Sequence, residues 1–220
     1  MENQNKLVND NLINLNKDNK LLFEKISKLE KIIEDNNKIN NENIIDDTKI
    51  LANNIKKQKR ITNWIKEKTK TNEVKYELIF RKGENGEEAE DFHKYCDNKG
   101  PTLTLIKTNK NYIIGGFTPL NWENDEEGIS VYDNSNQTFI FSINSNKRYD
   151  LIDSQKKQAI YNWKGVGPSF GNGNMKVTYN LNKGDCYDDS VCSFIVNGKH
   201  ELVGDKTFII QDLEVFKVKY

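Results

Sequence analysis

Long apolar runs are missing from this chain. No stretch approaches the roughly 20 consecutive apolar residues that cross a bilayer as a helix, and the first thirty residues lack the continuous apolar segment of a secretory signal. Cysteine is scarce as well, because Cys96, Cys186 and Cys192 form an odd set without dense spacing. Such usage fits a reducing compartment better than a disulfide framework. We therefore expect a cytoplasmic protein without a transmembrane segment.

Residues that bind metals and cofactors are equally few. His93, His200 and the three cysteines show none of the paired spacings of zinc sites. The glycines over 165–171 are spaced G-x-G-x-x-x-G, which differs from the dinucleotide-binding pattern, and no Walker-type Gly-Lys-Ser/Thr occurs. The acidic residues over 123–127 lack the order of a calcium loop. The sequence therefore predicts neither a metal nor a cofactor.

Opposite charges balance over the whole chain but not within its two parts. The 220 residues include 33 basic and 33 acidic side chains, and the mean hydropathy is −0.81. Residues 1–72 are rich in Asn and Lys and carry 15 basic and 11 acidic side chains. Residues 73–220 carry 18 and 22, and they hold most of the glycine and nearly all of the aromatic residues. We therefore predict a helical segment over 1–72 and a separate domain over 73–220 that folds alone.

The first part of the chain has a seven-residue apolar repeat. Apolar residues fall at alternating steps of four and three, namely Val8, Leu12, Leu15, Leu22, Ile26, Leu29 and Ile33. This spacing is typical of the seam of a left-handed coiled coil. Asn19 occupies one position of the seam, where a buried Asn selects register and strand number. We expect a homo-oligomer formed through residues 8–33; the alternative is a disordered, Asn-rich tail.

The repeat changes after residue 33. It is polar between Asn36 and Asn43 and resumes one residue out of phase, at Ile44, Leu51, Ile55 and Ile65, so we expect a break in the coiled coil there. A basic neck within 49–70 contains Lys56, Lys57, Lys59, Arg60, Lys66, Lys68 and Lys70. Its ordinary meaning is a solvated helix face, and contact with acidic lipid is the alternative. Nucleic acid is not an expected partner, because Trp64 is the sole aromatic residue of the neck.

The second part of the chain has the pattern of a β-rich domain. Short runs of β-branched and aromatic residues alternate with Gly, Asn and Asp clusters. These runs predict strands at 76–81, 102–107, 112–118, 138–143, 159–163, 175–180, 192–196 and 213–218. The second and third strands should form a hairpin, and 87–96 should form a helix with Ala89, Phe92 and Cys96 on one face. We also expect 78–81 to pair with 213–218, so that the two ends of the domain meet in one sheet.

An ordered set of short motifs in 73–220 resembles the TLDc domain of the oxidation-resistance protein family. The matching residues are 78–81, Phe92 and His93, 96–106, Gly115, Gly116, Phe117, Trp122, 139–143, Gly167, Pro168, Ser169, Phe170, Gly171, Glu214, Val215 and Phe216. The resemblance implies an antiparallel β-sandwich of two sheets with a few short helices. Many short strands with turn signals and one helix favour the same class.

The strongest catalytic motif is Gly167-Pro168-Ser169-Phe170-Gly171, which satisfies the G-x-S-x-G pattern of a nucleophile elbow. An elbow also requires a helix directly after the Ser, whereas 172–174 are turn formers that lead into a predicted strand. His200, with an Asp at 185, 188 or 189, would have to complete a triad in the usual chain order. We therefore expect a glycine turn at this position and no catalytic residue.

These observations favour a protein that acts by binding. The resemblance implies a non-catalytic TLDc module, presented on a coiled coil, in oxidative-stress protection or in regulation of the vacuolar ATPase. Its expected partner is a protein, and vacuolar ATPase subunits are the candidates that the resemblance supplies. Two rival functions remain open, a serine hydrolase acting through Ser169 and a purely structural coiled-coil tether.

Overall fold

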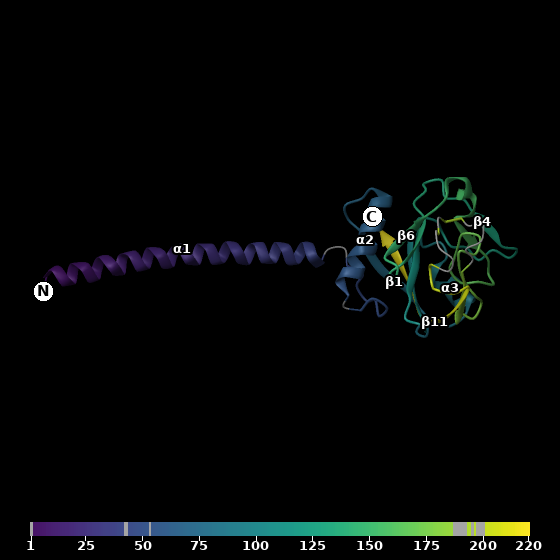
Figure 1. The fold of residues 1–220 in the computed structure, drawn as a ribbon, viewed down its shortest axis with the longest axis horizontal. Helices are drawn as coiled ribbons and strands as arrows, with labels where there is room; N and C mark the ends of the chain where they lie inside the picture. The colour runs from purple at the N-terminus through teal and green to yellow at the C-terminus, as the bar shows by residue number, and fades with distance from the viewer. Residues whose placement is uncertain (1, 42–43, 53, 187–192, 195, 197–200) are drawn as a thin grey trace. The chain divides into compact units, whose positions relative to one another are not determined.

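The computed structural model describes residues 2–41, 44–52, 54–186, 193–194, 196 and 201–220, and within the first helix it describes the side chains of residues 15–34. The chain divides into two compact units, Met1–Glu42 and Asn43–Tyr220. The first unit is one continuous helix, α1 (Glu2–Asn41), shown in purple in Figure 1. The helix continues through Asn36 and ends at Asn41, within the interval between Asn36 and Asn43 where the sequence predicted a break. Its apolar side chains from Leu15 to Ile33 are all exposed.

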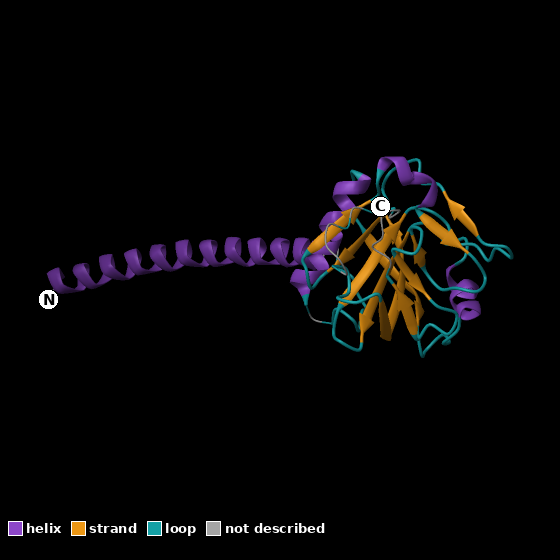
Figure 2. Ribbon diagram, turned by 45° about the vertical axis from the view of Figure 1, so that its right-hand side comes forward, coloured by secondary structure: helices purple, strands orange, loops and turns teal. Residues whose placement is uncertain are grey.

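Two antiparallel sheets form the second unit, as the sequence predicts, and Figure 2 shows them in orange. One sheet contains β1 (Lys75–Arg81), β2 (Thr102–Thr108), β3 (Ile113–Thr118), β5 (Phe139–Ser142) and β6 (Lys147–Asp150). The other contains β4 (Ile129–Val131), β7 (Ile160–Asn162), β8 (Ser169–Phe170), β9 (Met175–Val177) and β10 (Lys183–Asp185). The long last strand, β11 (Thr207–Lys219), pairs in both sheets and joins them.

The main apolar core contains residues of both sheets. Ile106 and Ile140 of the first sheet belong to one buried cluster with Phe170 and Val177 of the second. Alternating side chains of a strand point to opposite faces, so each sheet contributes one face to this core. The helix α3 (Ala89–Cys96) adds the buried side chain of Phe92, and a short 3₁₀ helix, η1 (Asp153–Gln158), precedes β7.

The expected strand pairings are present. β2 and β3 form the hairpin, with Thr102 opposite Thr118. β1 pairs with β11, with Leu78 opposite Phe216, so the domain's first and last strands are neighbours. The predicted strand at 192–196 lies largely outside the described residues, although Phe194 forms an isolated bridge with Leu151. The strands β4, β6, β8 and β10 do not appear among the sequence predictions, because each has only two to four residues, too few to show an alternating pattern.

The compact domain begins about thirty residues earlier than the boundary predicted near Asn72. The helix α2 (Ile55–Thr69) packs Ile61 and Ile65, both fully buried, against the outer face of the first sheet. Residues 45–51 belong to the same cluster through Ile45, Ile50 and Leu51. The apolar repeat of 44–65 therefore covers a sheet and does not continue the coiled coil. An apolar stripe has nearly the same period in both settings, and over one short helix the sequence does not distinguish them.

Candidate functional site

The Gly167–Gly171 motif folds as a strand and a turn. Ser169 and Phe170 form β8, which pairs with β9. Gly171 has a φ of +67°, in the left-handed region, and begins the turn between these strands. A nucleophile elbow would continue into a helix, and here a second strand follows. Ser169 is moreover only 1% exposed, so a substrate cannot approach its hydroxyl in this conformation.

His93, in the last turn of α3, connects this helix to the loop before β8. Its Nδ1 lies 2.8 Å from Oδ1 of Asp97, and its Nε2 lies 3.0 Å from the carbonyl oxygen of Trp163 and 3.1 Å from that of Val166. Two carbonyl oxygens face Nε2 and a carboxylate oxygen faces Nδ1, and this arrangement favours the imidazolium form, in which both ring nitrogens donate. Burial opposes this charge, but the hydrogen bond and charge of Asp97, together with the two carbonyls, raise the pKa of His93 above its ordinary value. A ring held in this way has no free lone pair to activate Ser169.

We expect the stability of the domain to fall as the pH rises through the neutral range. The folded pKa of His93 is raised, so its contribution is complete below the unfolded pKa of about 6.5 and is lost as the pH passes the folded pKa. Thermal melts between about pH 6 and pH 8 should show a falling midpoint, and His93→Gln should reduce that fall. Asp97→Asn should reduce it as well, because the neutral amide no longer favours the imidazolium. An unchanged pH dependence in both variants would refute this role of His93.

Ser169→Ala should leave the domain equally stable or slightly more stable. The buried hydroxyl of Ser169 has no hydrogen-bond partner among the described residues, and an unsatisfied buried polar group costs about 1–3 kcal/mol. Removing it should change the free energy of unfolding by between zero and about 2 kcal/mol in the stabilising direction, as measured in urea. Gly171→Val is the contrasting variant, because a β-branched residue is strained at its positive φ. Labelling of Ser169 by a fluorophosphonate would instead support the hydrolase.

A buried carboxylate fastens the start of the domain to its terminal strands. Glu214, in β11, is 1% exposed. Its Oε1 accepts hydrogen bonds from the backbone N of Lys49 at 2.8 Å and from Nε of Arg81 at 3.0 Å, and its Oε2 accepts from the hydroxyl of Thr48 at 2.7 Å. The same guanidinium also donates to the backbone carbonyl of Asp47. We call these five residues the Glu214 cluster. Its hydrogen bonds hold the loop before α2 in place, so its role is structural.

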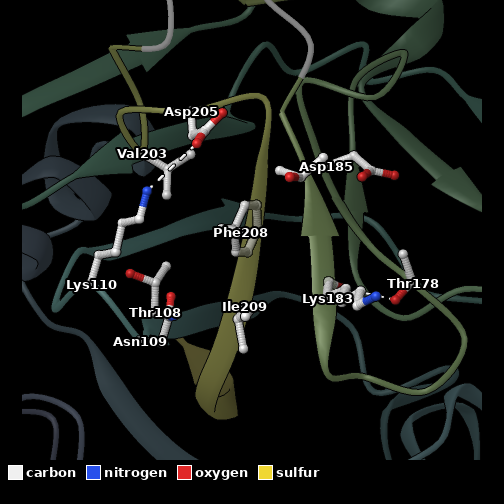
Figure 3. Close-up of a pocket in the computed structure, with 11 residues that line it drawn as sticks. Thr108, Asn109, Lys110, Thr178, Lys183, Asp185, Val203, Asp205, Phe208 and Ile209 are labelled. Carbon is white, nitrogen blue, oxygen red and sulfur yellow. Dashed lines mark hydrogen bonds and ion pairs between the residues drawn. The ribbon is translucent and has the colours of Figure 1, made fainter.

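A groove with a volume of about 460 Å³ lies beside β10 and β11. It is lined by Thr108, Asn109, Lys110, Thr178, Lys183, Asp185, Val203, Asp205, Thr207, Phe208 and Ile209. Figure 3 shows Ile209, which is 52% exposed, on β11 between two pairs of charged residues. Lys110 and Asp205, 3.5 Å apart, lie on one side, and Lys183 and Asp185 of β10 lie on the other. These side chains offer charged and apolar contacts but no pair of nucleophile and base.

Comparison with known proteins identifies this domain. The model of the TLDc domain family matches residues 44–219, most of the chain. The chain belongs to the TLDc family. The start of the match at residue 44 agrees with the compact unit that begins at Asn43. The chain is also similar to the MTOR-associated protein MEAK7 of Danio rerio, with 26% identity over 153 residues. That alignment covers 65% of this chain and 32% of the relative, so the chain spans about a third of the relative's length.

Of the His, Cys and Asp residues weighed for a zinc site or a catalytic triad, the structure describes His93, Cys96, Asp185 and Cys186 of the TLDc domain. Cys96 and Cys186 are both buried, and burial raises the pKa of the Cys96 thiol well above its ordinary value. Cys192, His200, Asp188 and Asp189 lie outside the described residues. Within the described ranges, no group of three His, Cys, Asp or Glu side chains is placed to hold a metal ion. In the same part of the chain, no helix has the length and apolar character to cross a membrane.

The acidic loop after Trp122 is held by its own hydrogen bonds. Asp125 accepts from the backbone N of Glu127 at 3.0 Å and of Gly128 at 2.6 Å, which closes a turn. Trp122 is buried, and its indole N donates to the hydroxyl of Thr102 at 2.9 Å. The aromatic residue beside the loop therefore anchors the core of the TLDc domain and is not an exposed contact for a partner.

Proposed function

We propose that this TLDc domain is a non-catalytic regulatory module that acts in the cytoplasm by binding a protein partner. The observation that carries the proposal is that the strongest catalytic motif of the sequence, Gly167–Gly171, does not fold as a nucleophile elbow. Ser169 is buried in a strand pair, and both nitrogens of His93 are engaged elsewhere. The relative MEAK7 is described as MTOR-associated, which makes mTOR one candidate partner. The family resemblance supplies vacuolar ATPase subunits as the other, with oxidative-stress protection as the wider role.

The proposal includes self-association through α1. The steps of three residues in the apolar repeat, such as Ile26 to Leu29, run from a to d positions of a heptad. This frame places Ile26, Ile33 and Asn19 at a positions and Leu at successive d positions. Ile at a with Leu at d favours two parallel strands, and one Asn at an a position fixes the register. The exposed seam side chains, at 43–57%, would be covered by a second copy of the helix.

Charges beside the seam fit the parallel arrangement. Lys25 occupies a g position and Glu30 the following e position, and such residues face each other across a parallel pair. Phe23 and Ile32, at other e and g positions, are exposed and extend the apolar contact. A two-stranded coil would present two TLDc domains together, and binding to a partner with two sites would then gain from a raised effective concentration.

Sedimentation tests the association. The variant with Ile26→Asp and Leu29→Asp should be a monomer at a concentration of tens of micromolar, roughly where a weak coiled coil still associates. The wild type should be a dimer, because the variant places charge inside the seam. The control carries Ser27→Asp and Lys28→Asp on the outer face of the same turn and should remain a dimer. A monomeric wild type would contradict self-association without affecting the binding proposal.

Partner binding is tested separately. The full chain and a chain of residues 43–220 are immobilised and probed with purified vacuolar ATPase subunits and with mTOR. The full chain should retain one of these proteins, and the shorter chain should retain it more weakly because it lacks avidity. If neither protein is retained at any protein density, both named partners are wrong and the structural tether gains support.

A further inference from the structure

The outward face of α2 carries a cluster of positive charge. The helix packs Gln58, Ile61, Thr62 and Ile65 against the sheet. The opposite side and its flanks carry Lys56, Lys57, Arg60 and Lys66, which we call the α2 basic face. Because the buried face is fixed in the core, these four side chains extend from a rigid support.

The domain offsets little of the charge of the α2 basic face, although Lys66 adds to the effect of Lys75 in lowering the pKa of Glu73. The helix contains one acidic residue, Glu67, and its carboxylate pairs with Arg148 of β6 at 2.7 Å. Lys68, on the flank, lies 3.7 Å from Asp150. For the four residues of the α2 basic face, no ion pair is found among the described parts of the chain. By contrast with residues 73–220, which hold 18 basic and 22 acidic side chains, α2 has six basic residues and one acidic residue, so this helix is locally rich in positive charge.

The stability of the helix does not explain this placement. Lys56 and Lys57 lie in the first turn, which has no acidic residue, beside the N-cap Asn54. The N-terminus of a helix carries a partial positive charge, so lysines there oppose the macrodipole by about 0.3–1 kcal/mol each. Positive charge that is unfavourable for folding and unpaired in the fold points to an external anionic partner.

Trp64 and Ile55 indicate whether that partner is a nucleic acid or a membrane surface. Trp64 is partly buried and its ring lies 5.8 Å from that of Phe141, so it is committed to the domain and does not offer a platform for nucleic-acid bases. Ile55, at the start of the helix, is 48% exposed beside Lys56. An exposed apolar side chain next to a basic face is typical of helices that lie on a membrane surface.

We propose that the α2 basic face binds the anionic phospholipid headgroups of a bilayer surface, with Ile55 entering the interfacial layer. The interaction is peripheral and electrostatic. Each Lys or Arg near an acidic bilayer contributes roughly a fivefold factor in partitioning, and salt weakens the attraction because the Debye length is about 10 Å at 0.1 M. The proposal concerns the domain alone and does not depend on self-association, although a dimer would bring two such faces to one surface.

Vesicle cosedimentation of the full chain tests the proposal. The wild type should bind vesicles with about 30% phosphatidylserine and not vesicles of phosphatidylcholine alone, and binding should fall steeply as salt rises above about 0.1 M. The variant with Lys56, Lys57, Arg60 and Lys66 all changed to Gln should bind roughly 600-fold more weakly, a factor of about five for each residue. The charge-matched control changes Lys94, Lys99, Lys183 and Lys206 to Gln, four exposed lysines elsewhere on the domain, and should bind as the wild type does.

A second variant and a competing ligand make the result decisive. Ile55→Ser keeps every charge and should weaken vesicle binding several-fold, while thermal melts confirm that each variant is folded. Equal losses in the basic-face and control variants would show attraction to net charge alone and would overturn the proposal, as would a wild type that does not bind acidic vesicles. Retention of single-stranded nucleic acid in place of vesicles, abolished by the basic-face variant, would assign the face to nucleic acid and overturn the lipid proposal.

Discussion

A chain that begins at residue 73 should fail to form a stable domain. It lacks Ile45, Ile50, Leu51, Ile61 and Ile65, which are 0–7% exposed in the full chain and cover the outer face of the first sheet. Burial of each such side chain contributes about 1.5–3 kcal/mol, so their joint loss is comparable to the whole stability of about 5–15 kcal/mol of a typical domain. The uncovered sheet face would also present aromatic side chains such as Phe139 to water.

The experiment compares residues 43–220 with residues 73–220. The longer chain should melt cooperatively, whereas the shorter chain should lack a cooperative transition and bind a hydrophobic dye. Within the intact chain, Ile61→Ser should destabilise by about 2–5 kcal/mol, and Ile55→Ser should have little effect because Ile55 is exposed. A cooperative melt of 73–220 with an unchanged midpoint would show that α2 is dispensable.

The contrast between Ile55 and Ile61 explains how the sequence misled us about α2. The heptad frame included Ile55, which is exposed, and passed over Ile61, which is fully buried. Across a helix of about four turns, an apolar stripe of period 3.6 differs only slightly from one of period 3.5. A single short helix therefore does not reveal whether its partner is another helix or a sheet. The family model, by contrast, includes this helix in the TLDc domain.

The strands that the sequence predicted correctly are those with long β-branched or aromatic runs. The hairpin of β2 and β3 and the pairing of β1 with β11 follow from such runs and from the domain's closure. The absence of a helix after Ser169 was also predicted, whereas the structure places Ser169 in a strand and the glycine turn after it, from Gly171. These features depend on local sequence, which a pattern can report.

The polar contacts of the interior could not be predicted in the same way. The three carbonyl and carboxylate partners of His93 include groups 70 and 73 residues away in the chain. Glu214 is 133 residues from Arg81 and 166 from Thr48. One signal was available: a charged residue between Leu213 and Val215, within an apolar strand, requires a buried partner. The sequence does not say which of 33 basic residues supplies it.

Loss of the Glu214 carboxylate should be among the most damaging single changes in the domain. Glu214→Ala leaves Arg81 without its most buried partner and leaves the Thr48 hydroxyl and the Lys49 backbone N without an acceptor. Breaking a buried ion pair from one side costs about 3–5 kcal/mol, measured as the change in the free energy of unfolding. Thr48→Val keeps the carboxylate but removes two hydrogen bonds, the one that the hydroxyl donates to Glu214 and the one that it accepts from the Leu51 backbone N, and should cost about 1–3 kcal/mol.

A double variant separates the contribution of the charges of Arg81 and Glu214 from the contribution of their side-chain packing. Arg81→Met with Glu214→Leu replaces the pair by apolar side chains of similar size, and it should recover much of the stability that Glu214→Ala loses, because no uncompensated charge remains. Hydrogen exchange should nevertheless show residues 44–52 opening more readily in the double variant, since the Thr48 hydroxyl and the Lys49 N–H lose their acceptor there as well. If Glu214→Ala is as stable as the wild type, the carboxylate does not hold this segment, and the start of the domain is retained by the apolar contacts of α2 alone.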